Sequence, residues 1–243
     1  LARLQHRGAD NFGMITMPGT GCSRGHTRLS IVDLEPRSNQ PFVSPCGRYI
    51  IVFNGEIYNF RNLRQTLEQK GVRFRTTSDT EVLLHWLMTQ GVLGLQELDG
   101  MYAFGFVDIS ARTLLLARDA IGEKPLYYCE TLADGKPHFS FASEIKALRW
   151  LPDVDRSLNR TALLDFMRFL YTAPPHTLYH GIHELQPGHW LQVDLRTGRS
   201  QPPQAFYSIE KSLDYEETVT PQDAVTRFRE LFEESVNLRL ISD

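Results

Sequence analysis

The stretch Tyr-Ile-Ile-Val-Phe-Asn-Gly-Glu-Ile-Tyr-Asn, residues 49–59, constrains the fold of this chain most strongly. It begins with strand-favouring residues and continues into Asn54-Gly55, a dipeptide typical of hairpin turns. The residues that follow predict a helix instead of a second strand. Asn59 is its expected cap, Phe60, Leu63 and Leu67 form its apolar face, and Gly71 ends it. Asn54 and Gly55 are therefore expected at a tight corner between a strand and a helix. An amide side chain and a glycine N–H at such a corner can donate to one point and stabilise an oxyanion.

The composition indicates a globular protein with a substantial core, because the chain has 243 residues and 42% of them are hydrophobic. Its formal net charge is −3, and acidic and basic residues are interspersed. This pattern argues against a nucleic-acid partner and against a basic patch for anionic lipid. No apolar run approaches the roughly 20 residues that a membrane-spanning helix needs, so no membrane partner is predicted.

The cysteines and histidines predict neither a disulfide framework nor a metal site. Cys22, Cys46 and Cys129 lie far apart without a CxxC pair. Free thiols are typical of a reducing compartment, so we expect a cytoplasmic protein. His180 and His183 flank a glycine in a region without helical periodicity, which does not favour a metal site.

Hydrophobic periodicity predicts an α+β architecture. A turn is expected at residues 6–13, and Ser78 and Glu81 match a capping box at the start of a helix. Strands are predicted at residues 25–33, 49–53, 72–76, 100–108, 113–119, 138–142 and 190–195, and helices at 60–70, 79–90, 144–148, 161–170 and 221–240.

Two charged residues have both an ordinary and a functional interpretation. Arg28 lies on the predicted strand at 25–33, where an arginine is more often a solvated edge residue, although its guanidinium is well suited to bind a carboxylate. Asp79 lies in the first turn of a predicted helix, where it complements the helix dipole or accepts hydrogen bonds from a ligand ammonium group. The residue pattern does not decide between these roles.

The last part of the chain has the pattern of a linker followed by the start of a second domain. Periodicity fades and prolines and charges accumulate over residues 199–219. An amphipathic helix then starts with Thr220 as cap, Pro221 at its first position and Asp223 in its first turn. A single helix cannot bury its own apolar face, so we expect it to belong to a second domain.

Several motifs in register resemble the glutamine-hydrolysing asparagine synthetases. They are Arg-Leu-Ser-Ile-Val-Asp, Asn-Gly-Glu-Ile-Tyr-Asn, Ser-Asp-Thr-Glu, Asp-Gly-Met-Tyr-Ala-Phe, Ala-Arg-Asp followed by Gly-Glu-Lys-Pro-Leu-Tyr-Tyr, and Ala-Ser-Glu-Ile-Lys-Ala-Leu. The resemblance implies a class II glutamine amidotransferase domain with the four-layer αββα sandwich of N-terminal-nucleophile hydrolases. This domain would span residues 1–198, with a linker at 199–219 and the first helix of an ATP-binding synthetase domain at 220–243.

The resemblance also assigns roles to individual residues. Arg28 would hold the α-carboxylate of glutamine, and Asp79 its α-ammonium group. Asn54 and Gly55 would form the oxyanion hole, and Glu56 would contribute to substrate binding. The glutamine-contacting strand would further include Leu29, Ser30, Ile31 and Val32.

The resemblance implies a nucleophile that this sequence does not contain. In the family an N-terminal cysteine attacks glutamine and its own α-amine acts as the base, whereas none of the three cysteines here aligns with that position. We therefore expect a piece of a longer enzyme that lacks its first strand, its nucleophile and most of its synthetase domain. On its own, this piece is expected to hydrolyse no glutamine.

The complete protein is expected to hydrolyse glutamine and deliver ammonia to aspartyl-AMP in its own C-terminal synthetase domain. That domain would bind ATP and Mg²⁺, the present domain would need no cofactor, and the protein could form a homodimer. One alternative is a relative that amidates another carboxylate in sugar or natural-product synthesis. Another is a glutamine-binding or scaffolding domain without a nucleophile.

Overall fold

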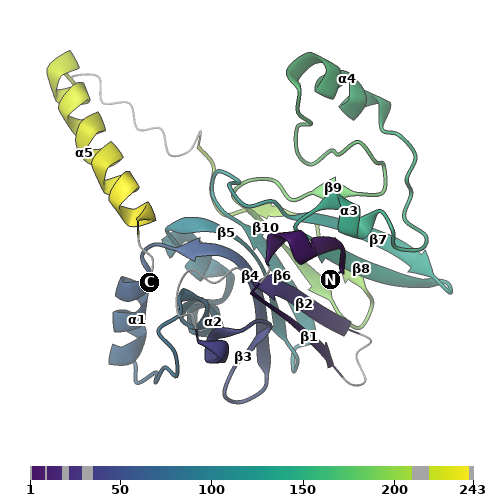
Figure 1. Ribbon diagram of the computed structural model, residues 1–243, viewed down its shortest axis with the longest axis horizontal. Coiled ribbons are helices and arrows are strands. Elements are labelled where there is room, and N and C mark those ends of the chain that lie inside the picture. Colours follow the sequence, from purple (N-terminus) through teal and green to yellow (C-terminus); the bar gives the residue numbers. More distant parts are fainter. Residues whose placement is uncertain (1, 9, 18–21, 29–34, 210–218, 241–243) are drawn as a thin grey trace.

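The computed structural model describes residues 2–8, 10–17, 22–28, 35–209 and 219–240 (Figure 1). They form a mixed α+β arrangement of strands and helices. The strands are β1 (Asn11–Met17), β2 (Cys22–Arg28), β3 (Phe42–Val43), β4 (Tyr49–Ile57), β5 (Gly100–Asp108), β6 (Thr113–Arg118), β7 (Tyr127–Ala133), β8 (Lys136–Ala142), β9 (His183–Glu184), β10 (His189–Asp194), β11 (Arg199–Ser200) and β12 (Gln204–Ala205). The α-helices are α1 (Phe60–Gln69), α2 (Asp79–Gln90), α3 (Ile145–Leu148), α4 (Arg160–Phe169) and α5 (Pro221–Arg239), and the 3-10 helices are η1 (Ala2–Arg7), η2 (Pro36–Ser38) and η3 (Gly91–Glu97).

A seven-stranded antiparallel sheet forms the centre of the described structure. Its order is β11-β10-β6-β5-β4-β3, with β12 also paired to β10. The strands β4, β5 and β6 are apolar on both faces, as expected for strands that are covered on both sides. A three-stranded sheet, β8-β7-β9, and the hairpin β1-β2 complete the strands that the structure describes.

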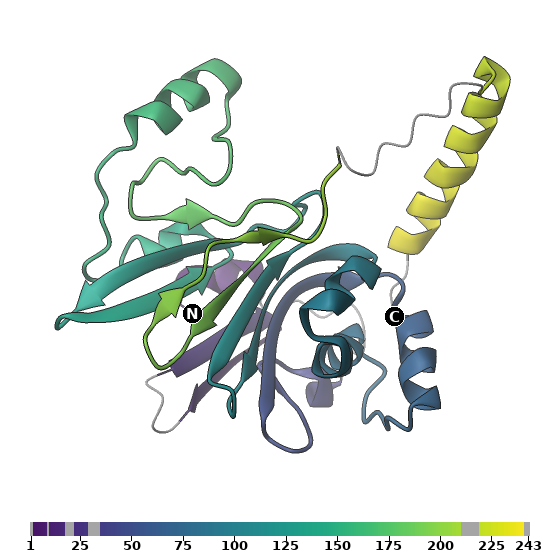
Figure 2. The same ribbon diagram turned by 180° about the vertical axis from the view of Figure 1, so that it is seen from behind.

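Three apolar clusters show what covers each sheet. One face of the central sheet packs against α1 and α2 (Figure 2), with Ile51, Phe53 and Phe104 facing Leu83 and Leu87. Its other face packs against the hairpin and the three-stranded sheet, through residues that include Ile50, Val107, Leu116, Met17, Leu126 and Tyr128. The far face of the three-stranded sheet packs against α3, through Cys129, Ala142 and Leu148.

Most of the predicted elements are present in the structure. The strands predicted at 100–108, 113–119, 138–142 and 190–195 correspond to β5, β6, β8 and β10, and the helices predicted at 60–70, 79–90, 161–170 and 221–240 correspond to α1, α2, α4 and α5. Thr220 caps α5 as expected, since its side chain accepts a hydrogen bond from the Asp223 N–H. The strand predicted at 25–33 is β2, which already begins at Cys22, and residues 29–34 lie outside the described part of the chain.

Two predictions about local structure are wrong. Residues 72–76 form no strand, because the buried carboxylate of Glu81 accepts the N–H groups of Arg75 and Thr76 that a neighbouring strand would otherwise bond. Glu81 therefore does not complete the predicted capping box, although Ser78 does cap α2 by accepting from the Thr80 N–H. The turn predicted at 6–13 is narrower than expected, because η1 ends at Arg7 and β1 begins at Asn11.

The corner between strand and helix does not lie at Asn54-Gly55, where it was predicted. The strand β4 continues through both residues to Ile57, paired with β5 throughout. Asn59 lies at the cap of α1 as predicted, but its side chain bonds the Glu97 carbonyl and the Asp99 N–H instead of the first helical turn.

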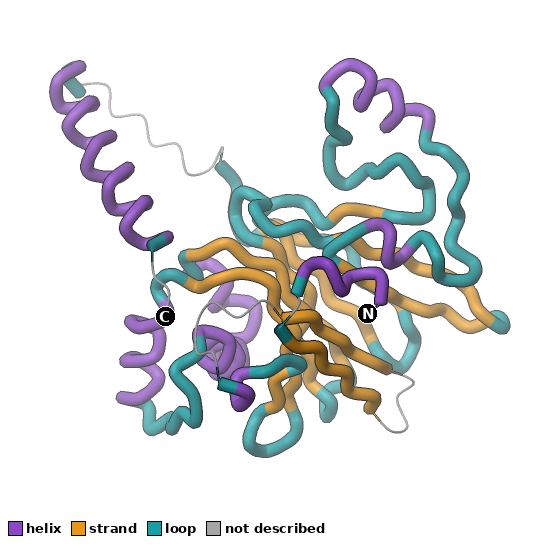
Figure 3. The backbone as a smooth tube through the Cα atoms, viewed as in Figure 1, coloured by secondary structure: helices purple, strands orange, loops and turns teal. Residues whose placement is uncertain are grey.

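The strands β11 and β12 lie within the predicted linker at 199–219 and pair with β10. After the undescribed residues 210–218, α5 exposes apolar side chains, among them Val225 (60% exposed) and Phe228 (69%). The helix α4, which stands away from the sheets (Figure 3), likewise exposes Leu164 and Met167. No helix among the described residues is long and apolar enough to cross a membrane.

Arg118 and Asp119 organise the loop after β6. Arg118 is buried and donates to the carbonyl oxygens of Lys124 and Gly122 (each 2.8 Å) and to the Glu184 carboxylate (2.7 Å). Asp119 is fully buried and accepts the backbone N–H groups of Tyr102, Ile121, Glu123 and Lys124. The loop is thus held by two side chains that satisfy its backbone groups.

We predict that Arg118→Leu destabilises the protein by about 3–5 kcal/mol, because it leaves the largely buried Glu184 carboxylate (12% exposed side chain) and two loop carbonyl oxygens without their partner. The measurement is urea unfolding followed by circular dichroism. Arg227→Leu is the control, since Arg227 forms an exposed helical pair at 3.8 Å and such pairs contribute little. Equal unfolding midpoints for the two variants would contradict the prediction.

Candidate functional site

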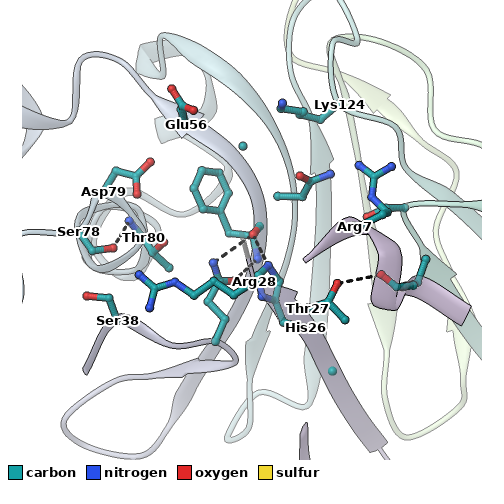
Figure 4. Close-up of a pocket in the computed structure, with 17 residues that line it drawn as sticks. Arg7, His26, Thr27, Arg28, Ser38, Glu56, Ser78, Asp79, Thr80 and Lys124 are labelled. Carbon is teal, nitrogen blue, oxygen red and sulfur yellow. Dashed lines mark hydrogen bonds between the residues drawn. The ribbon is translucent and has the colours of Figure 1, made fainter. Parts of the chain in front are cut away.

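A cavity of about 280 Å³ lies between β2, β4 and the start of α2 (Figure 4). It brings together all five predicted site residues that the structure describes, namely Arg28, Asn54, Gly55, Glu56 and Asp79. Leu29, Ser30, Ile31 and Val32, the other predicted contacts, lie outside the described residues. The remaining lining residues are Leu4, Arg7, Gly25, His26, Thr27, Ser38, Gln40, Phe53, Ser78, Thr80, Lys124 and Ser143.

The outer edge of β4 presents three N–H groups toward this side of the sheet. The Phe53 N–H donates to the Gln40 side chain and the Ile57 N–H donates to the Asp79 carboxylate. Residues two apart on a strand point their N–H groups to the same side, so the Gly55 N–H faces the cavity between them. Tyr102 lies opposite Gly55 on β5, but its backbone N–H and carbonyl oxygen both bond Asp119, on the side of β5 away from β4.

Only glycine fits at position 55. Its φ is +150°, and a Cβ there would collide with the carbonyl oxygen of Met101 on β5. The close approach of β5 therefore excludes a side chain, and the backbone N–H is left accessible to a ligand in the cavity.

The amide nitrogen of Asn54 is a buried hydrogen-bond donor. Its Nδ2 atom has no hydrogen-bond acceptor among the residues that the structure describes. A buried amide donor is costly to leave unpaired. Since Asn54 lines the cavity next to Gly55, a ligand oxygen that accepts from both donors would remove that cost.

Asp79 places a buried carboxyl group on the cavity wall. It is the first residue of α2, is 7% exposed, and accepts the Ile57 N–H at 3.1 Å. Burial raises its pKa to about 6, although its backbone hydrogen bonds oppose this shift. A cationic ligand group at this carboxyl would favour its charged form.

Arg28 reaches the cavity from the end of β2. Its side chain is 7% exposed, and its Nη1 donates to the Asn39 Oδ1 atom (2.7 Å) and to the Glu35 carbonyl oxygen (3.1 Å). These bonds fix the guanidinium on the side of the cavity where Ser78 and Asp79 lie (Figure 4). A fixed guanidinium and a nearby carboxyl together match the two charges of a free amino acid.

Glu56 and Lys124 are a second pair of opposite charges that line the cavity. Burial raises the pKa of the half-buried Glu56, and Lys124 opposes this shift. Arg7 comes from η1 and is held by Glu144 at 3.1 Å. Figure 4 shows Lys124 and Arg7 across the cavity from Asp79.

Several lining residues were missed by the sequence reasoning. His26 contacts the Phe53 carbonyl oxygen at 3.0 Å, and burial lowers its pKa to about 4. Strand alternation places it on the same face as Arg28, which is the signal that could have identified it. Gln40 and Lys124 lie in loops, where periodicity gives no signal.

No cysteine is among the described residues that line the cavity. Cys129 is buried in the third apolar cluster, where burial raises its pKa to about 11. The structure also places no group of three or more His, Cys, Asp or Glu side chains that could hold a metal ion among the residues it describes. The described residues that line the cavity include hydrogen-bond donors and charged groups.

A model of the glutamine amidotransferase domain family matches residues 1–207. The chain is 34% identical to glutamine-hydrolyzing asparagine synthetase 2 of Bacillus subtilis (strain 168), over 89% of the chain and 29% of that protein. It is 35% identical to synthetase 1 of the same organism, over 99% of the chain and 36% of that protein. It is 29% identical to amidase chry2 of Gibberella zeae, over 99% of the chain and 34% of that protein.

The chain spans about a third of the length of these relatives. The family match nevertheless covers most of the chain, including every described residue that lines the cavity. This chain therefore belongs to the glutamine amidotransferase domain family, as a class II domain related to the glutamine-hydrolysing asparagine synthetases.

Proposed function

We propose that this chain is the glutaminase part of an ATP-dependent asparagine synthetase. It would bind glutamine and release ammonia for aspartyl-AMP, which its own C-terminal synthetase domain would form from ATP with Mg²⁺. The observation that carries the proposal is the grouping of Arg28, Asp79, Asn54 and Gly55 around one cavity. The similarity to two asparagine synthetases supports this choice of acceptor.

Each group in the cavity has a place in the reaction. The Arg28 guanidinium would bind the α-carboxylate of glutamine, and the Asp79 carboxylate its α-ammonium group. With the two charges held, the side-chain amide lies toward Asn54 and Gly55. Attack on its carbonyl carbon converts the carbonyl oxygen into an oxyanion, which the Asn54 Nδ2 and the Gly55 N–H would stabilise.

The nucleophile in this proposal is the N-terminal cysteine that the resemblance implies. Its thiolate would displace ammonia to give a thioester, which water would hydrolyse to glutamate. We further propose the αββα sandwich for the fold, supported by the order of α1 and α2, the central sheet, the smaller sheets and α3 in the apolar clusters. A cytoplasmic location is supported by the three free cysteines.

A second candidate is an amidotransferase of the same family that acts on another carboxylate. The 29% identity to amidase chry2, over 99% of the chain, favours keeping it. The two candidates differ in the acceptor and share the glutamine site. An assay of the intact protein with glutamine, ATP and aspartate separates them, because only the first candidate gives asparagine in step with glutamate release.

We predict that Asn54→Ala in the intact protein lowers kcat for glutamine hydrolysis on the order of 10²–10³-fold, as expected for the loss of one of two oxyanion donors. The measurement is glutamate release at saturating glutamine. Asn62→Ala, at an exposed position on α1, is the control and should leave kcat unchanged. An unchanged rate for Asn54→Ala would remove Asn54 from this role.

We also predict that glutamine affinity rises with pH through about 6, where Asp79 becomes charged. Below that pH the carboxyl is protonated and cannot pair with the ammonium group, so affinity should fall about tenfold for each pH unit. The measurement is calorimetric titration of the intact protein between pH 5 and 8 with glutamate, which carries the same α-carboxylate and α-ammonium groups and is not hydrolysed.

Two variants show which group causes this change of affinity near pH 6, called the step below. Asp79→Asn should bind more weakly at pH 7.5 and show no step, whereas Glu56→Gln should keep the step although Glu56 also has a raised pKa. A step that Asp79→Asn retains would show that another group controls glutamine affinity.

A further inference from the structure

The side chain of Gln40 takes the place of a strand against β4. In the ladder between β3 and β4, Phe42 pairs with Ile51, and continuing this register would place the Gln40 backbone opposite Phe53. The pairing instead stops at Phe42. The Gln40 side chain accepts the Phe53 N–H at 2.6 Å, and its own amide donates to the Phe53 carbonyl oxygen at 3.1 Å.

Because a side chain takes the place of the strand here, the next outward-facing position along β4 is left uncovered. A regular strand would go on from Phe53 to cover the Gly55 N–H, and in this register its covering residue would be Ser38. Ser38 and Gly55 both line the cavity instead. The Gly55 N–H therefore faces the ligand space between two bonded neighbours, with Gln40 on the Phe53 side and Asp79 on the Ile57 side.

Burial and a second contact make this arrangement rigid. Gln40 is only 9% exposed, so its two hydrogen bonds are protected from competing water. The Phe53 carbonyl oxygen also contacts the His26 Nε2 atom at 3.0 Å. Both backbone polar groups of Phe53, the residue directly before Asn54, are therefore held by side chains.

We propose that Gln40 is a positioning residue for the oxyanion hole. It holds the edge of β4 straight at Phe53, so that the Gly55 N–H and the Asn54 side chain meet the same developing oxyanion. This proposal rests on the proposed glutaminase function. Because an oxyanion is present in the transition state and not in bound glutamine, losing Gln40 should lower kcat more than it raises KM.

The test is Gln40→Met in the intact protein, which keeps the size of the side chain and removes both hydrogen bonds. We expect kcat for glutamine hydrolysis to fall on the order of 10-fold to 100-fold, the scale of a small misplacement of catalytic groups. KM and the affinity for glutamate, which passes through no tetrahedral transition state on binding, should change less than about threefold. Gln65→Met, at an exposed position on α1, should behave like the unchanged protein.

Three results would overturn the proposal. They are an unchanged kcat, a KM that rises while kcat is constant, and a kcat that falls only in proportion to the folded fraction measured by circular dichroism. Should Gln40→Met not fold, Gln40→Glu replaces it, since it keeps the acceptor for the Phe53 N–H and loses the donor. For Gln40→Glu as well, the proposal requires that kcat falls while the affinity for glutamate is retained.

The outcomes also separate this proposal from the proposed function. If the intact protein hydrolyses no glutamine, the proposed function fails. If it does and Asn54→Ala lowers kcat while Gln40→Met does not, only the role of Gln40 fails.

Discussion

The hydrogen bond from the Ile57 N–H to the Asp79 carboxylate, 3.1 Å long, holds the end of β4 against the first turn of α2. Both elements are fixed by the core, because Ile51 and Phe53 of β4 pack against Leu83 and Leu87 of α2. The two walls of the cavity therefore keep their spacing without a ligand. The same bond places a carboxyl group where burial opposes its charge, as its raised pKa shows. A ligand cation would relieve this cost, so the fold itself favours an occupied site.

The sequence was sufficient to predict elements whose burial follows a simple period. The strands β5 and β6 and the helices α1 and α2 have regular apolar patterns, and the structure confirms them. Residues 72–76 also alternate, but the decisive contact comes from Glu81, a side chain that reaches back from α2. Alternation shows that a segment can be a strand, whereas a partner for its N–H groups decides whether it becomes one.

The site was predictable only in part for a related reason. Local pattern left Arg28 and Asp79 with two roles each, and the family resemblance assigned one, which the shared cavity supports. Asn54-Gly55 was expected at a corner, because its dipeptide signal is strongest for turns. The close approach of β5 at Met101 explains the glycine instead. Gln40 gave no local signal, since its role depends on the register of β3 against β4.

The fold fixes the groups that surround the cavity before any ligand binds. The Gly55 N–H belongs to a central strand and the Arg28 guanidinium is bonded to Asn39 and Glu35, so neither needs to reorganise when a ligand binds. The backbone of Lys124 is held as well, because its carbonyl oxygen accepts from Arg118 and its N–H donates to Asp119. Donors fixed before the reaction stabilise developing charge at the lowest cost in reorganisation. The rigid edge of β4 is therefore the part of this cavity best suited to stabilise the transition state.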